Sequence, residues 1–266
     1  STPKIFSRSP TILVKDSRKG GDTDLGAFSD LVGFQNRRNV DNEVYILQSH
    51  RLMSEVVKRL HLTVNYSVRE GLRTADLYGR SPIEVDFIND NSKQKLSLEV
   101  TPLRNGKIEL TDFEDKFVTR QETKRVILAE YGDTVATPVG QVVVHKTLFM
   151  DSTYLKKPIT VIKNSLAATT NAYRAAVKSD VANKQASIVT ISMNNSVPRR
   201  AEDVINTLIA VYEEDAIADK RQLSVVTADF IKERMQVIGR ALGDVDRDIE
   251  DMKKSNKMIA ITSEAT

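Results

Sequence analysis

The chain has 266 residues, of which 40% are hydrophobic and 28% are charged, enough to bury one substantial core. Its 39 basic and 36 acidic residues leave a formal charge of +3 and do not cluster as a nucleic-acid-binding surface requires, so we expect no nucleic-acid partner. The absence of cysteine excludes disulfides, a thiol nucleophile and thiolate metal sites.

No run of apolar residues approaches the length of a membrane helix, and the first residues lack the apolar stretch of a signal peptide. The two ends, Ser1-Thr2-Pro3 and Glu264-Ala265-Thr266, are not typical of natural chain termini. We therefore expect a segment of a longer protein, with any membrane anchors outside it.

The first 62 residues predict a strand, a loop and a helix. Residues 11–15 are β-prone, whereas residues 17–39 are rich in Gly, Ser, Asp and Arg and predict a long flexible loop. Residues 41–60 have helical periodicity, with a possible restart at Ser49 as N-cap and His61 at the helix end. One face of this helix is apolar and is expected to pack on a sheet; it contains Met53, Val56, Val57 and Leu60.

Between residues 62 and 145 the hydrophobic period falls to two, which is typical of strands. Asn105-Gly106 favours a hairpin between the apolar runs at 96–100 and 108–110. Residues 141–145 are almost wholly apolar, which indicates an inner strand. Further strands are predicted at residues 64–68, 83–87 and 125–130.

Residues 158–193 are predicted to form a strand, a helix at 165–177 and a second strand at 185–193, which leads into a long helix. This alternation favours an α/β unit with one or more parallel pairs in a mixed sheet. The predicted fold class is therefore α+β: an α/β base domain with a mixed sheet, plus a long protruding C-terminal α-helix.

The C-terminal helix carries a heptad pattern. Residues 198–258 contain no proline after the first turn, and Ser196 with Pro198 supplies a cap-like start. Seven apolar residues advance by alternating steps of four and three, and we call them the seam: Ile231, Met235, Ile238, Leu242, Val245, Ile249 and Met252. A helix of this length reaches roughly 90 Å, so most of it is expected to lie outside any core.

These patterns predict three parts. Residues 1–198 form the base domain, residues 199–258 form the long helix, and residues 259–266 begin a descending arm. Gly239 and Gly243 lie within the helix, and the sequence leaves open whether it bends there.

No catalytic, cofactor or metal site is predicted. His50, His61 and His145 are far apart and lack the spacing of metal ligands. The acidic residues Asp244, Asp246 and Asp248 resemble the start of a calcium loop, but Ile249 replaces the glycine that such a loop needs, so the helical interpretation is favoured.

Two groups of residues resemble a known family. Residues 40–62, from Val40-Asp41-Asn42-Glu43 through Gln48-Ser49-His50-Arg51-Leu52 to Leu60-His61-Leu62, are similar to the asparagine, glutamate, leucine, serine and helix signature of bacterial polysaccharide co-polymerases, the Wzz-type chain-length determinants. Ile188 to Ser192, Pro198-Arg199-Arg200-Ala201, Ile205-Asn206-Thr207-Leu208 and Tyr212 resemble the family's strand, proline, alanine, asparagine-x-leucine and tyrosine run. Residues 227–231 and 253–257 resemble two shorter motifs of its long helix.

The resemblance implies the periplasmic domain of a bacterial inner-membrane protein, held by flanking membrane helices that this chain does not contain. It implies a ring-shaped homo-oligomer that regulates the chain length and export of capsular polysaccharide, exopolysaccharide or O-antigen. Implied partners are a polysaccharide polymerase, an outer-membrane export channel and possible contacts with the glycan chain. The kinase-linked branch resembles this chain most, and its cytoplasmic tyrosine kinase domain is not in this sequence.

Two other interpretations stay open from the sequence. A periplasmic coiled-coil adaptor that docks to an export channel without controlling chain length would have the same fold class. A glycan-cleaving enzyme would need two carboxylates at a fixed separation, for which Glu99 and Asp112 on the predicted sheet are candidates, although nothing in the pattern pairs them.

Overall fold

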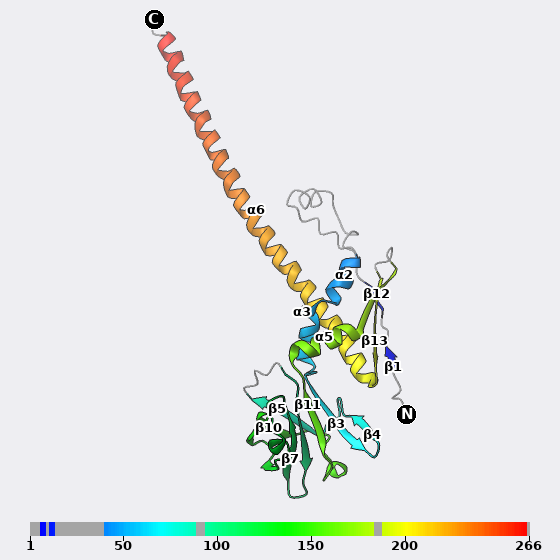
Figure 1. Cartoon of the computed structure of the whole chain (residues 1–266). Helices are drawn as coiled ribbons and strands as arrows, with labels where there is room; N and C mark the ends of the chain where they lie inside the picture. The colour runs from blue at the N-terminus through cyan, green and yellow to red at the C-terminus, as the bar shows by residue number, and fades with distance from the viewer. Residues whose placement is uncertain (1–5, 9–10, 14–39, 89–93, 184–187, 265–266) are drawn as a thin grey trace. The chain divides into compact units, whose positions relative to one another are not determined.

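A computed structural model of the chain describes residues 6–8, 11–13, 40–88, 94–183 and 188–264. Its fold class is α+β, with antiparallel sheets and a long C-terminal helix (Figure 1). The chain divides into two compact units after Tyr212, and we call them the base unit and the arm unit. The loop predicted at residues 17–39 lies outside the described residues.

The base unit contains two larger sheets and one smaller sheet, and every strand pair that is described in them is antiparallel. The six-stranded sheet has, in spatial order, β4 (Arg73–Asp76), β3 (Val64–Glu70), β11 (Ile159–Lys163), β6 (Leu96–Pro102), β7 (Lys107–Glu114) and β8 (Ile127–Glu130). The three-stranded sheet has β5 (Ile83–Ile88), β10 (Gly140–Lys146) and β9 (Thr134–Thr137).

These two sheets share one apolar core. Strand β6 buries alternate residues, and β10 buries three consecutive valines, as the predicted inner strand should. The β6–β7 hairpin turns at the predicted Asn-Gly pair: Gly106 has φ +79°, and the Asn105 side chain accepts a hydrogen bond from the Lys107 N–H at 3.1 Å. The largest fully buried side chain of this core is Phe113 on β7.

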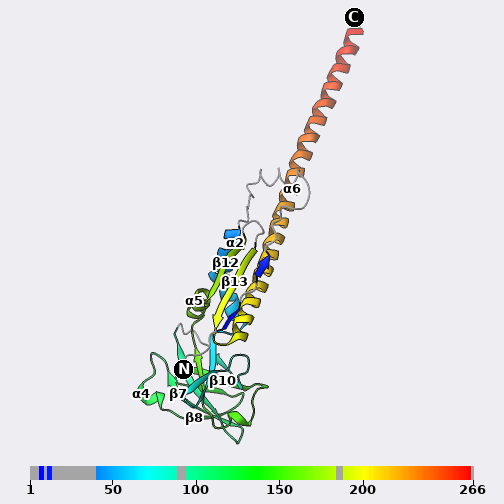
Figure 2. The same ribbon diagram turned by 90° about the vertical axis from the view of Figure 1, so that its right-hand side faces the viewer.

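The third sheet is built on β13 (Ile188–Asn195). It pairs with β12 (Val177–Asn183) on one side and with β1 (Phe6–Arg8) and β2 (Thr11–Leu13) on the other. A second core lies between this sheet and four helices (Figure 2). The helices are α2 (Val40–Leu47), α3 (His50–Arg59), α5 (Leu166–Ala176) and the first turns of α6 (Pro198–Glu264).

The expectation of a parallel strand pair is wrong for the described strands. After α5 the chain does not return to the six-stranded sheet but forms β12, which makes an antiparallel pair with β13. The sequence analysis missed β12 because its residues 177–183 contain only Val177 and Val181 as large apolar side chains, so no strand period is visible.

The predicted break in the first helix is confirmed. α2 ends at Leu47, and Ser49 is the N-cap of α3, where its hydroxyl accepts a hydrogen bond from the Leu52 N–H at 3.3 Å. Met53, Val56 and Val57 are fully buried in the second core, as the apolar face predicted. His61, just after α3, has φ +50° and is exposed.

Candidate functional site

The first turns of α6 are held in the base unit by one apolar face. Ala201, Val204, Ile205 and Leu208 are at most 1% exposed, and Val211 closes the face one turn later. The spacing of these residues places them on one side of the helix, against α2, α3 and β13 in the second core.

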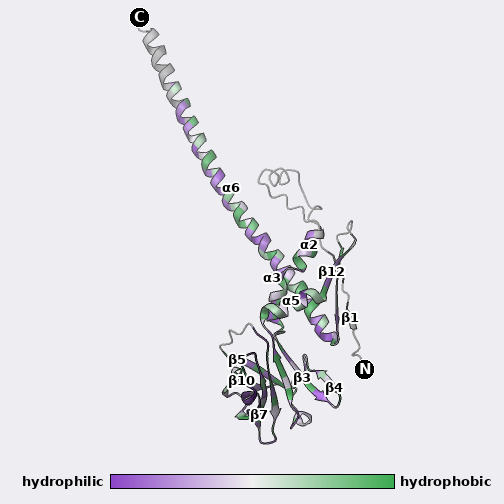
Figure 3. Cartoon of the chain, in the orientation of Figure 1, coloured by the Kyte–Doolittle hydropathy of each residue, from purple (hydrophilic) through white to green (hydrophobic). Residues whose placement is uncertain are grey.

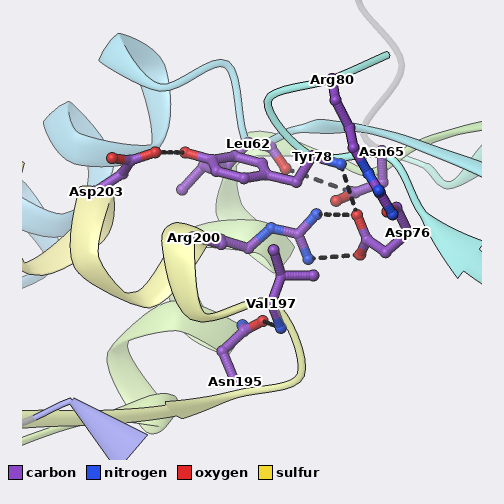
Figure 4. Close-up of polar contacts among 9 residues, drawn as sticks. All are labelled: Leu62, Asn65, Asp76, Tyr78, Arg80, Asn195, Val197, Arg200 and Asp203. Atoms are coloured by element: carbon purple, nitrogen blue, oxygen red, sulfur yellow. Dashed lines mark hydrogen bonds and ion pairs between the residues drawn. The ribbon is translucent and has the colours of Figure 1, made fainter. Parts of the chain in front are cut away.

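An ion pair between the buried Arg200 and the partly exposed Asp76 holds the same turns to the end of β4. Both terminal nitrogens of Arg200 bind the two carboxylate oxygens of Asp76, each at 2.8 Å (Figure 4). The Arg200 side chain is 9% exposed, and its guanidinium also lies 4.6 Å from the centre of the Tyr78 ring. This planar two-point contact fixes direction as well as distance, which a lysine would not do.

Tyr78 extends this contact by one further turn of α6. Its backbone N–H donates to Asp76 at 2.9 Å, and its hydroxyl donates to Asp203 at 3.0 Å. Burial, followed by the hydrogen bond and charge of Asp203, raises the pKa of Tyr78 well above its usual value. We call Asp76, Tyr78, Arg200 and Asp203 the anchor. The sequence analysis missed it because Asp76 and Arg200 are 124 residues apart, and no local pattern joins them.

A second contact joins the two regions that carry the family resemblance. Tyr212 donates a hydrogen bond to the carboxylate of Glu43 at 2.5 Å, although 169 residues separate them in sequence. Glu43 on α2 is only 2% exposed. The glutamate of the first motif and the tyrosine of the second therefore meet directly at the end of the base unit.

Beyond Tyr212, α6 exposes large apolar side chains instead of burying them. All seven residues of the predicted seam lie on this helix, within an arc of about 100° at 3.6 residues per turn. Their exposed fractions are 45% for Ile231, 68% for Met235, 61% for Ile238, 62% for Leu242, 53% for Val245, 45% for Ile249 and 73% for Met252. Green and purple bands alternate along this part of α6 in Figure 3. The helix continues through Gly239 and Gly243.

A shallow, open hollow lies beside the seam on α6. The hollow is lined by Ala228, Ile231, Lys232, Met235 and Gln236. In the heptad of the seam, Ala228 and Met235 occupy position a, Ile231 position d and Lys232 position e. Four residues at such positions form the hole into which a partner's knob inserts in a coiled coil.

A pocket of about 350 Å³ lies in the base unit beside the anchor. Its walls include Tyr66, Tyr78, Phe149, Arg200 and Asp203. Tyr78, Arg200 and Asp203 belong to the anchor, so one wall of this pocket is formed by the contacts that attach α6.

The three histidines do not form a cluster. His145 lies 3.5 Å from Asp86 in an exposed pair, and His50 and His61 are exposed elsewhere. No group of three or more potential metal ligands occurs among the described residues. Asp244 lies in the middle of α6, where Arg247 contacts it at 3.3 Å, so the segment is helix and not a calcium loop.

The structure brings Glu99 and Asp112 together, as the sequence could not foresee. A register shift between β6 and β7 gives Asp112 a left-handed backbone, with φ +49°. Partial burial raises the pKa of Glu99, and the charge and hydrogen bond of Asp112 raise it further.

The chain combines an α+β base unit with a long helix that exposes apolar side chains at heptad spacing. Comparison with protein-family models gave no match, and comparison with curated proteins gave none. Within the described part of the chain, no helix is both long and apolar enough to cross a membrane.

Proposed function

We propose that this chain is the periplasmic, oligomerising segment of a bacterial polysaccharide co-polymerase, which regulates the chain length and export of a surface glycan. The observation that carries the proposal is the exposed seam on the arm unit. The motifs that resemble this family supply the particular class.

The contact between Glu43 and Tyr212 supports this class. The first family-like motif lies on α2 and α3, and the second runs from β13 into α6. Residues from both motifs pack in the same core, among them Leu47, Leu52, Ile191 and Leu208. Motifs that match a family by chance have no reason to meet in space, whereas motifs that define a fold do.

The energetics of the seam support self-association. Fully burying one large apolar side chain is worth about 1.5–3 kcal/mol. Because the seven seam residues are 45–73% exposed, covering them is worth roughly 6 kcal/mol at the lower end, before the cost of association. An uncovered stripe of this length is unfavourable in water and prone to aggregation. A second copy of the chain presents the same stripe and is always available at the same concentration.

The test replaces Leu242 and Ile249 with aspartate in the full-length membrane protein. Charges in the seam should dissociate the oligomer, measured by analytical ultracentrifugation in detergent, and change the length distribution of the glycan on a gel. The control is Gln222→Asp with Arg240→Asp, which adds at least as much negative charge on the opposite side of α6. The control should leave both readouts unchanged.

Two results would contradict the proposal. If the native protein sedimented only as a monomer, the proposed self-association would be contradicted. A seam variant that loses glycan export but keeps normal chain lengths would favour the adaptor that docks to an export channel.

A further inference from the structure

The pocket beside the anchor is a cavity that the contacts of α6 line without filling. Its volume of about 350 Å³ falls in the range of small-molecule sites, about 300–1,000 Å³. Two of its wall segments are tied to each other, since the Thr147 hydroxyl donates to the Ser81 carbonyl oxygen at 2.5 Å and the Ser81 hydroxyl donates to the Ile83 carbonyl oxygen at 2.6 Å. Because these segments are already fixed, little ordering of the walls is needed when a ligand binds.

The charged groups of the pocket disfavour an anionic ligand. The carboxylates of Glu84, Asp86 and Asp203 line it. Among the described residues of its walls, Arg200 is the only side chain with a permanent positive charge, and both of its terminal nitrogens already bind Asp76. A phosphate, a sulfate or a uronic acid would therefore bring negative charge next to negative charge.

The Tyr66 hydroxyl gives the pocket a hydrogen-bond donor. It accepts a hydrogen bond from the Val85 N–H at 2.9 Å, and its own proton meets no acceptor within the described part of the chain. Burial is the main cause that raises the pKa of Tyr66 to about 12, and the charges of Glu84 and Asp86 add to it. These carboxylates therefore act on the interior of the pocket as well as on its surface.

Aromatic rings form the apolar part of the walls. Phe149 lines the pocket and is 51% exposed, so part of its ring is open to a ligand, whereas the Tyr78 ring already has the Arg200 guanidinium 4.6 Å from its centre. A pyranose sugar suits these walls, because its C–H face packs on an aromatic ring and its hydroxyls donate to carboxylates. A purely apolar ligand would leave the carboxylates with neither water nor hydrogen bonds.

We infer that this pocket binds an uncharged sugar unit of the glycan, with its C–H face against Phe149 and its hydroxyls bound to the carboxylates of Glu84 and Asp203. The inference rests on the proposed function and names the class of sugar that the base unit takes: a neutral hexose or N-acetylhexosamine, not a uronic acid or a phosphorylated sugar. Asp203 belongs to the pocket and to the anchor, so a bound sugar also stabilises the attachment of α6.

Saturation-transfer-difference NMR on the full-length protein tests this inference. The protein would be held in nanodiscs of phosphatidylethanolamine and phosphatidylglycerol, which contain neither sugar nor choline. The probes, each at millimolar concentration, are cellobiose and N,N′-diacetylchitobiose as neutral sugars, digalacturonate as an acidic sugar and choline as a small cation. At least one neutral sugar should receive saturation at its ring protons, whereas digalacturonate and choline should not.

Two substitutions with matched controls locate the binding. Phe149→Ala should weaken the binding of the neutral sugar by roughly 3- to 10-fold, because it removes the exposed ring. Its control is Phe117→Ala, since Phe117 is 74% exposed between β7 and β8 and does not line the pocket. Glu84→Gln should also weaken binding, and its control is Glu70→Gln at the end of β3. All four residues are exposed, so thermal unfolding without sugar should show unchanged stability.

The inference would be overturned if neither neutral sugar received saturation, or if Phe149→Ala left the transfer unchanged. Binding of digalacturonate or choline that is lost in Phe149→Ala would likewise overturn it, by assigning the pocket to a charged ligand. These results would leave the proposed function intact, because its test is the seam variant. Conversely, a seam variant with unchanged oligomer and glycan lengths would contradict the proposed function, while transfer to a neutral sugar would still support the pocket.

Discussion

The two parts of α6 have the same kind of sequence pattern and opposite surroundings. In the base unit, the steps from Ala201 through Ile205 to Leu208 follow a helical rhythm, and all three side chains are buried by the chain's own strands and helices. In the arm unit the same rhythm continues through the seam, whose members are 45–73% exposed. The comparison teaches that periodicity shows which face of a helix is apolar, but not which element, if any, covers that face.

The most direct test of this difference is to truncate one leucine in the base part of α6 and one in the arm. Leu208→Ala should reduce the free energy of unfolding of the base unit by about 2–5 kcal/mol, because Leu208 is fully buried and leaves a cavity. Leu242→Ala should leave that free energy unchanged, since Leu242 is 62% exposed in the single chain, and should instead weaken the oligomer. Denaturant unfolding followed by near-ultraviolet tyrosine circular dichroism would measure the first effect, and sedimentation the second.

Equal losses of base stability from both leucines would contradict the comparison. They would mean that the arm unit is coupled to the base core. A loss from Leu242→Ala that depends on protein concentration would instead agree with coverage by a second copy.

The anchor provides the next largest expected effect. Arg200→Met should cost about 2–3 kcal/mol of base stability, because it leaves the Asp76 carboxylate, which is 33% exposed, without the two nitrogens that donate to it. The adjacent Arg199→Met is the matched control: the Arg199 side chain is 69% exposed, and its nitrogen lies 3.9 Å from Asp203. Its loss should cost less than about 1 kcal/mol. Thermal unfolding of both variants would measure the two losses of stability. Equal losses from Arg200→Met and Arg199→Met would show that the ion pair with Asp76 does not hold α6.

Much of this fold follows from local sequence patterns. The Ser49 cap, the hairpin at Asn105-Gly106 and the seam on α6 were predicted because each depends on residues that are neighbours in the chain. Strand β12 and the strand pairing depend on long-range packing, and the sequence analysis missed the first and expected a parallel pair in the second.

The same distinction applies to the candidate site. The seam residues were predicted by their spacing alone, but the anchor required the pairing of Asp76 with Arg200, which only the folded chain shows. The meeting of Glu99 with Asp112 was likewise invisible, because it depends on a register shift between two strands.

A smaller effect is expected at Tyr66, whose hydroxyl accepts a hydrogen bond from the Val85 N–H at 2.9 Å. Burial, as the largest cause, raises the pKa of Tyr66 from 10.0 to about 12. Because the folded state holds this proton more tightly than the unfolded state, the base should lose stability as the pH rises from about 10 to about 12. Tyr66→Phe should cost about 1–3 kcal/mol at neutral pH, by leaving that N–H without its acceptor, and should weaken this alkaline loss.

Ultraviolet titration of tyrosinate, combined with unfolding at several pH values, would measure both effects. Since Tyr66 belongs to the sheet core and not to the arm, the alkaline loss should be the same in a seam variant that no longer oligomerises. A midpoint that moves with oligomeric state would show that the sheet core depends on assembly.

The smallest expected effect concerns Glu99, and here the substitution should raise the free energy of unfolding instead of lowering it. Because partial burial and Asp112 raise the pKa of Glu99, its folded carboxyl is penalised when it ionises, and its contribution to stability falls as the pH rises through that range. Glu99→Gln removes this penalty and keeps an oxygen for the Thr160 hydroxyl, which now donates to Glu99 at 3.2 Å. The variant should be slightly more stable than the native chain at pH 7, by about 0.5 kcal/mol or less, and should lose its advantage at pH 4.

Glu109→Gln on the neighbouring strand β7 is the matched control for the same change of side chain. Paired unfolding curves at the two pH values would measure the difference. A destabilised Glu99→Gln at pH 7 would mean that the ionised carboxyl is held by contacts that outweigh its burial. In that case the Glu99 carboxylate would be stabilised by a partner outside its contacts in the single chain, as we propose for the seam.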